Sequence, residues 1–248
     1  LAVGLVQGCV AVPQFQDPGL ERALYPGLVE LTQPEIEAAL DKEVSIRPPL
    51  AAGVAWLGGA SPDFHSEYHR TGVLEAAVAA LRQEPFGMVT SIPTIPMPVS
   101  VDRRGQERPF PPTLDALRGA CARFQCDVAL LMQTGVARDS GPNVLAIAYL
   151  PLVTIPLVPG TDLAASASVE MCAIDVRTGV LLGCARGRCA KTKRFVFPTS
   201  TAEAEGRLSE EALREAVVAA AGDLRAQLSQ RLVVSAERSG GPRERPAK

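Results

Sequence analysis

The apolar positions of the chain follow two different periods, and these predict strands and helices in turn. Residues 50–57 and 127–134 are nearly continuous apolar runs, which is typical of strands buried on both faces of a sheet. Between these two runs, apolar residues recur at helical spacing over 73–81 and 114–124, and residues 86–92 form a shorter apolar run. The order strand, helix, strand, helix, strand predicts a sheet whose first part is parallel.

The pattern changes in the second half of the chain. Residues 143–158, 163–176 and 180–189 have strand character and are separated by turn signals, which predicts an antiparallel meander. A long amphipathic helix follows over residues 213–232. We therefore expect a single α/β domain over residues 50–235, in which a mixed sheet packs against helices.

The turn before the last strand predicts a register. The loop Arg177-Thr178-Gly179 has glycine third, which favours a type I turn followed by a bulge. The predicted opposite pairs, all on one face, are Val176 with Val180, Ile174 with Leu182, and Cys172 with Cys184. Opposite Cβ atoms lie about 4.5–5.5 Å apart. Cys172 and Cys184 are therefore candidate disulfide partners, and two reduced core thiols are the alternative.

Three further segments lie around or inside this domain. Thr32-Gln33-Pro34-Glu35 is typical of a capping box and predicts a short helix before the domain. The proline-rich segment 92–112 is expected to be a loop. Residues 236–248 are polar and rich in proline, glycine and arginine, so we expect a disordered tail.

The start of the chain carries the most specific signal. The apolar run Leu1–Val6 is followed by Gln7-Gly8-Cys9, with a small residue directly before the cysteine. This is the pattern of a bacterial lipobox, in which the thiol becomes a diacylglycerol thioether and the preceding residues are removed. We interpret residues 1–8 as part of a signal peptide and residues 9–49 as a lipidated tether. The alternative is a short buried strand with a core cysteine.

Composition limits the partners. The 248 residues carry a net charge of −2, which gives no field that favours nucleic acid. No apolar run reaches the roughly 18 residues of a membrane-spanning helix. The membrane is therefore expected to be a partner only through the N-terminal lipid. Val10 is not the aspartate that retains lipoproteins in the inner membrane of enteric bacteria, so we expect the periplasmic face of the outer membrane.

Candidate chemistry is sparse. His65 and His69 stand four apart, as zinc ligands on a helix do, but two solvated histidines are the simpler interpretation. Neither a Gly-x-Ser-x-Gly elbow nor a glycine-rich phosphate loop occurs. We expect no catalytic residues and no cofactor. The basic run 186–194 would either contact an acidic partner or lipid headgroups, or protect an edge strand from wrong pairing.

Several short segments together resemble the bacterial rhombotarget lipoproteins, and the resemblance covers nearly the whole chain. The residues that carry it are Val6–Cys9, Ala23-Leu24-Tyr25-Pro26, Gly53–Leu57, Leu114–Leu131 and Cys172–Leu181. The architecture also looks like the α/β domain of envelope lipoproteins that assemble secretion channels. The resemblance implies a lipoprotein of the bacterial cell envelope.

Three functions follow as hypotheses. The first is a non-catalytic envelope lipoprotein that contacts a protein partner or serves in assembly. The second is an envelope enzyme that depends on a metal or a thiol. The third is a subunit of an oligomeric secretion or surface-assembly complex, joined through exposed strand edges.

Overall fold

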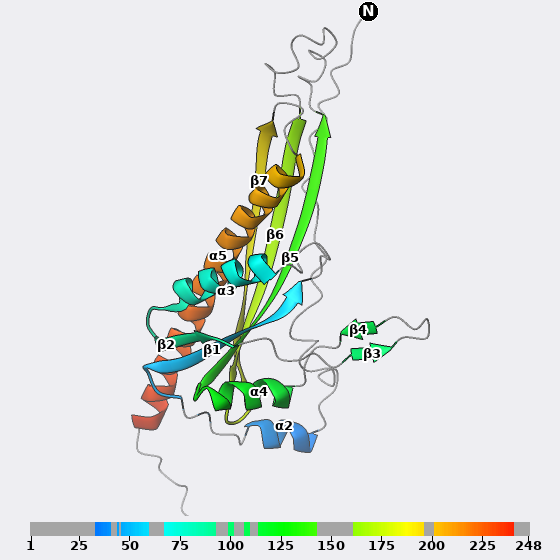
Figure 1. The fold of residues 1–248 in the computed structure, drawn as a ribbon. Coiled ribbons are helices and arrows are strands. Elements are labelled where there is room, and N and C mark those ends of the chain that lie inside the picture. The colour runs from blue at the N-terminus through cyan, green and yellow to red at the C-terminus, as the bar shows by residue number, and fades with distance from the viewer. Residues whose placement is uncertain are drawn as a thin grey trace, which may run out of the picture.

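The fold is built around one twisted, five-stranded sheet (Figure 1). The structure is a computed structural model, and it describes residues 33–40, 44, 46–59, 67–92, 99–101, 107–109, 114–142, 161–195 and 201–240. The strands of the sheet are β1 (Leu50–Gly59), β2 (Phe86–Ser91), β5 (Val128–Pro142), β6 (Thr161–Asp175) and β7 (Leu181–Phe195). The helices are α2 (Gln33–Leu40), α3 (Glu67–Leu81), α4 (Leu114–Arg123) and α5 (Thr201–Gly240).

The strand order is β2-β1-β5-β6-β7, and it divides the sheet into two halves. β1 pairs in parallel with both β2 and β5, because helices α3 and α4 carry the chain across between successive strands. β5, β6 and β7 then pair antiparallel. The mixed sheet with a parallel first part and an antiparallel second part is therefore confirmed.

Helices cover the two faces of the sheet unequally. α3 and α5 pack on one face, where they bury the alternate residues Leu50, Ala52 and Val54 of β1 together with one face of β5, β6 and β7. α4 packs on the other face, where Leu117 and Cys121 contact the ends of β5 and β6. The period of two along each strand assigns neighbouring residues to these two separate cores.

The antiparallel half reaches well beyond the parallel half (Figure 1). β5, β6 and β7 are each 15 residues long, whereas β2 has 6. The 40-residue helix α5 runs along β6 and β7 and also contacts α3. None of the helices among the described residues is long and apolar enough to cross a membrane.

The boundaries of several elements differ from the prediction. The last helix begins at Thr201 and continues to Gly240, past the predicted start of the tail at residue 236. The segment 92–112 is not wholly a loop, because β3 (Val99–Val101) pairs antiparallel with β4 (Glu107–Pro109). The predicted strand 143–158 lies outside the described residues.

The β6–β7 turn is one residue wider than predicted. The Asp175 N–H donates to the Val180 carbonyl at 3.0 Å, and the Gly179 N–H donates to the Asp175 carbonyl at 2.8 Å. Ile174 therefore pairs with Leu181, and a bulge between Ala173 and Ile174 restores the predicted register farther along. The predicted pair Val176 with Val180 is thus wrong.

The bulge also changes which face one side chain occupies. Leu182 was expected beside Ile174, but it packs in the core under α5. Leu181 takes the expected place against the α4 core. Beyond the bulge, Cys172 lies opposite Cys184, so this part of the predicted register is confirmed.

Candidate functional site

Four cysteines and several charged side chains lie together at the end of the sheet that α4 covers. Cys172 and Cys184 are joined there as a disulfide between neighbouring strands, with a Cα–Cα distance of 4.1 Å. Cys172 is fully buried in the core that also holds the thiols of Cys121 and Cys126. Four sulfur atoms therefore share one apolar cluster behind α4.

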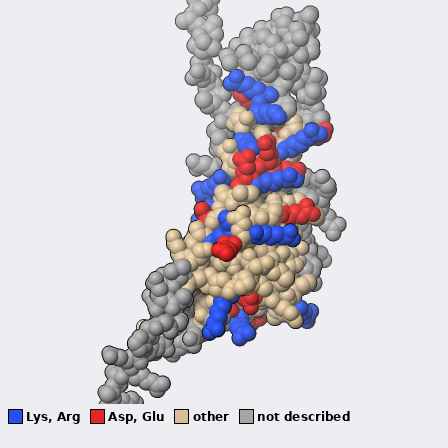
Figure 2. All heavy atoms as spheres, turned by 90° about the vertical axis from the view of Figure 1, so that its left-hand side faces the viewer, with Lys and Arg blue, Asp and Glu red and all other residues tan. Residues whose placement is uncertain are grey.

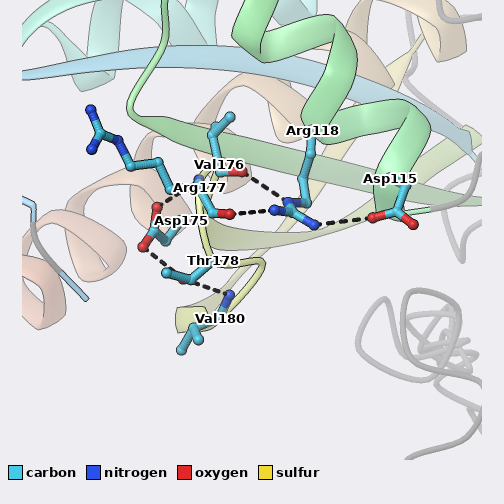
Figure 3. Close-up of polar contacts among 7 residues, drawn as sticks. All are labelled: Asp115, Arg118, Asp175, Val176, Arg177, Thr178 and Val180. Carbon is cyan, nitrogen blue, oxygen red and sulfur yellow. Dashed lines mark hydrogen bonds and ion pairs between the residues drawn. The ribbon is translucent and has the colours of Figure 1, made fainter. Parts of the chain in front are cut away.

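Arg118 connects α4 to the β6–β7 turn (Figure 3). Its Nε donates to the Val176 carbonyl at 2.8 Å, and its Nη2 donates to the Arg177 carbonyl. Asp115, one helical turn earlier on α4, holds Nη1 at 3.0 Å. One guanidinium thus satisfies two turn carbonyls that no strand partner can reach, and it fixes the turn against the helix.

The carboxylate of Asp175 shapes the same turn from inside (Figure 3). Its Oδ1 accepts the Arg177 N–H at 2.9 Å, and its Oδ2 accepts the Thr178 hydroxyl at 2.7 Å. Gly179 follows with a φ of 73°, a conformation that residues with a Cβ rarely adopt. These local bonds explain why the turn is wider than the pattern of apolar residues suggests.

A pocket of about 340 Å³ lies beside this turn. Its lining residues are Ile46, Ala122, Gln125, Cys126, Asp127, Asp175, Val176 and Arg177. Asp127 is the second carboxylate in it, and its Oδ2 accepts the Ala51 N–H at 3.0 Å. Both carboxylates in the pocket already accept hydrogen bonds from backbone N–H groups, so each has a structural role there.

The thiols in the cluster behind α4 are held in their protonated form. Burial raises the pKa of Cys121 to about 12, and the neighbouring Cys126 adds to this shift. Burial also raises the pKa of Cys126, with a further contribution from Asp127. Since the thiolate is the nucleophile, neither thiol is activated at neutral pH.

A second polar group joins β7 to α5. The Cys189 thiol donates to Glu215 Oε2 at 3.2 Å, and Lys191 Nζ lies 2.6 Å from Glu215 Oε1 and 2.9 Å from Glu211 Oε1. Burial and this hydrogen bond raise the pKa of Cys189, while Lys191 lowers the pKa of Glu215. The carboxylate is thus paired with the ammonium group and does not act as a base toward the thiol.

The basic run 186–194 lies on β7, at one edge of the sheet, as the edge-strand interpretation requires. Arg186 pairs with the buried Glu170 at 3.0 Å, and Arg194 pairs with Asp162 at 3.4 Å. Figure 2 shows basic and acidic side chains intermingled on the face that it presents. Acidic side chains of the same chain therefore form ion pairs with several of these basic side chains.

The sequence pattern does not predict the roles of Arg118 or of the group formed by Lys191, Glu211 and Glu215. Their partners are far away in sequence, and no local motif marks them. Cys9 and His65 lie outside the described residues, and His69 lies in α3 with its side chain outside them. No group of three His, Cys, Asp or Glu side chains suited to a metal ion occurs in the part of the chain that the structure describes.

No protein family and no curated protein matches the chain. The resemblance to the rhombotarget lipoproteins therefore stays a prediction. Comparison with solved structures does find proteins of similar architecture. The similarity is one of backbone arrangement, because sequence identities are 10–12% in the examples that follow.

Three of these similar structures illustrate the range. A neuraminyllactose-binding hemagglutinin homologue from Helicobacter pylori is 10% identical, with 77% of this chain and 92% of that one covered and a TM-score of 0.45. The PelC dodecamer from Paraburkholderia phytofirmans is 11% identical, with coverages of 72% and 92% and a TM-score of 0.33. The rare lipoprotein B from Shewanella oneidensis is 12% identical, with coverages of 75% and 98% and a TM-score of 0.30. At these TM-scores the similarity assigns no function to the chain.

Proposed function

We propose that this protein is a lipid-anchored lipoprotein of the bacterial cell envelope that acts through protein contacts. The observation that carries the proposal is Cys9, which follows a small residue at the end of an apolar N-terminal run. A diacylglycerol thioether on that sulfur, with a further acyl chain on the new N-terminus, would hold the domain at a membrane surface.

The disulfide between Cys172 and Cys184 supports a location outside the cytosol. Disulfides persist in oxidising compartments such as the periplasm and are rare where glutathione and thioredoxin keep thiols reduced. The pairing also sits in a folded hairpin whose register already brings the two residues together. An oxidising envelope compartment would therefore complete this bond without rearranging the fold.

The chemistry of the described residues supports an interaction role. The thiols of Cys121, Cys126 and Cys189 all have raised pKa values, which disfavours nucleophilic attack at neutral pH. Asp127 and Asp175 are engaged in hydrogen bonds to the backbone. The proposed work of the domain is therefore to present a rigid surface to another envelope protein, with the outer membrane as the proposed location.

Metabolic labelling tests the anchor. Bacteria that express the full chain are grown with radiolabelled palmitate, and we expect label in the wild type and none in Cys9→Ala. The Cys9→Ala protein is also expected in the soluble fraction. Cys189→Ala is the matched control, because it removes a partly exposed thiol elsewhere and is expected to keep both label and membrane association.

Two outcomes contradict the proposal. Equal labelling of wild type and Cys9→Ala would place any acyl chain on another residue. Equal membrane association of the two forms would show that the anchor is not lipid on Cys9. Separation of the inner and outer membranes by density then shows which of them carries the wild-type protein. Finding it in the inner membrane would contradict only the proposed outer-membrane location.

A further inference from the structure

The two edges of the sheet are protected very differently. β7 carries five basic residues at one edge, whereas β2 at the other edge reads Phe-Gly-Met-Val-Thr-Ser and carries no charge. Proteins usually protect an edge strand with charge, proline or a covering element, because an open edge pairs with other chains. Among the described strands, none pairs with the outer side of β2.

The register shows which backbone groups of β2 face outward. The Ile92 N–H donates to the Val54 carbonyl of β1 at 2.8 Å. Because successive residues of a strand direct their backbone groups to opposite sides, the N–H and C=O groups of Val89 and Ser91 lie on the outer side. Ser91 is exposed. β2 therefore offers regularly spaced donors and acceptors to another strand.

A groove of about 490 Å³ runs between this edge and α3. Its apolar lining comes from α3 and β2 and consists of Leu74, Val78, Ala79 and Val89. Glu75 and Arg82 also line it, and both are exposed. Glu75 lies in α3, and Arg82 directly follows its last residue with its N–H still donating to the Val78 carbonyl at 3.2 Å, so the two are seven residues or about 10 Å apart along the helix axis. Along the helix, Val78 and Ala79 lie between an acidic side chain, Glu75, and a basic one, Arg82.

This arrangement is complementary to itself. A two-fold rotation through the edge exchanges the two ends of the groove, so the acidic end of one copy meets the basic end of the other. We propose that β2 pairs antiparallel with β2 of a second copy of this chain, about a two-fold axis at Thr90. Val89 of each copy then bonds reciprocally with Ser91 of the other, and the two sheets become continuous.

The same rotation places two ion pairs across the interface. Glu75 of each copy lies opposite Arg82 of the other, with Val78 and Ala79 near the axis between the two α3 helices. Ala79 is small and exposed, which allows the helices to approach closely. On the opposite face of β2, Met88 is 49% exposed in the single chain and becomes covered by the second copy's strand.

The proposed dimer is independent of the lipid anchor, since none of its residues lies near Cys9 in sequence. If no palmitate is incorporated at Cys9 but the dimer is found, only the proposed lipid anchor is contradicted. If the chain is lipidated but monomeric, only the proposed dimer is contradicted. The partner is a second copy and not an unrelated strand because the charge pattern of the groove matches its own two-fold image.

Charge reversal tests the ion pairs. Sedimentation equilibrium of the full chain in detergent solution is expected to show a dimer. Glu75→Arg and Arg82→Glu each bring like charges together and are expected to raise the dimer dissociation constant at least about tenfold. The double variant Glu75→Arg/Arg82→Glu restores opposite charges and is expected to return to within about threefold of wild type. Arg123→Glu, exposed on α4, is the matched control and is expected to change nothing.

Cross-linking tests the axis. Facing residues of antiparallel strands have Cβ atoms about 4.5–5.5 Å apart at a non-hydrogen-bonded pair, so Thr90→Cys is expected to form a disulfide-linked dimer on mild oxidation. Thr192→Cys, exposed on β7 at the other edge, is the control and is expected to stay monomeric. Both are made in a Cys189→Ala background, which removes the partly exposed thiol.

Three results would overturn the proposal. The first is a wild-type chain that stays monomeric at every concentration. The second is a dimer that neither charge reversal weakens, or that the double variant fails to restore. The third is a Thr90→Cys protein that links to a strand of a different envelope protein and never to itself.

Discussion

At the scale of single residues, close contact decides which side chain a position tolerates. Gly187 of β7 faces α5, and a Cβ built on it would lie 1.9 Å from the Ala216 carbonyl oxygen. The obstacle is helix backbone, which cannot rotate aside as a side chain does. Glycine at this position and alanine at 212, 216 and 220 let the helix lie directly on the strand.

Gly187→Ala tests this contact. The added methyl group forces α5 away from β7, so we expect the free energy of unfolding to fall by about 2–3 kcal/mol in urea denaturation. Gly119→Ala is the matched control, because a Cβ there meets nothing within 4 Å and the residue lies inside α4. Helix propensity predicts that the control gains about 0.5–1 kcal/mol. Equal effects of the two substitutions would contradict the close packing.

At the scale of elements, the β6–β7 hairpin is held in three ways. A ladder of backbone pairs runs from Thr161 opposite Phe195 to Ile174 opposite Leu181. The disulfide crosses it near the turn, and Arg118 binds the turn from α4. Because the ladder alone sets the strand alignment, the disulfide acts mainly by restricting the unfolded chain.

Reduction of the disulfide tests this division of roles. The bond closes a loop with a sequence separation of 12, so a reductant is expected to lower the free energy of unfolding by about 3 kcal/mol while the far-ultraviolet circular dichroism of the folded protein is unchanged. The Cys172→Ala/Cys184→Ala variant is the control and is expected to be insensitive to reductant. A folded state that loses its strand signal on reduction would show that the bond, and not the ladder, holds the hairpin.

At the scale of the whole molecule, β5 joins two cores that lie on opposite sides of the sheet. Leu130 packs in the core under α3 and α5, and its neighbour Leu131 packs in the core under α4. Neither core can lose its packing without disturbing the strand that both share. The two cores are therefore expected to unfold together, as one cooperative unit.

Two core truncations test this coupling. Leu117→Ala in α4 and Leu213→Ala in α5 each remove a fully buried side chain, and each is expected to cost about 2–5 kcal/mol. Thermal unfolding followed by Trp56 fluorescence and by circular dichroism is expected to show one coincident transition in both variants. Val218→Ala, on the exposed side of α5, is the control and is expected to change little. Separate transitions by the two probes would mean that the cores are independent.

Much of the architecture could be predicted from the sequence. The apolar runs of β1 and β5 and the helical spacing between them indicated the parallel half, because a strand covered on both faces must be apolar at successive positions. The Arg177-Thr178-Gly179 turn also predicted that Cys172 lies opposite Cys184, but that pairing holds because the bulge between Ala173 and Ile174 offsets the extra turn residue. The apolar runs are a local property of the chain, whereas the final register of the hairpin is not.

Only the tertiary structure decided the rest. The side chain of Asp175 and the guanidinium of Arg118 widen and hold the turn, and the bulge that follows moves Leu182 to the other core. Lys191 meets Glu215 only because α5 lies along β7. A pattern of apolar positions records which residues avoid water, but it does not record which distant polar group will satisfy a given carbonyl or charge. That choice depends on how the elements pack in three dimensions.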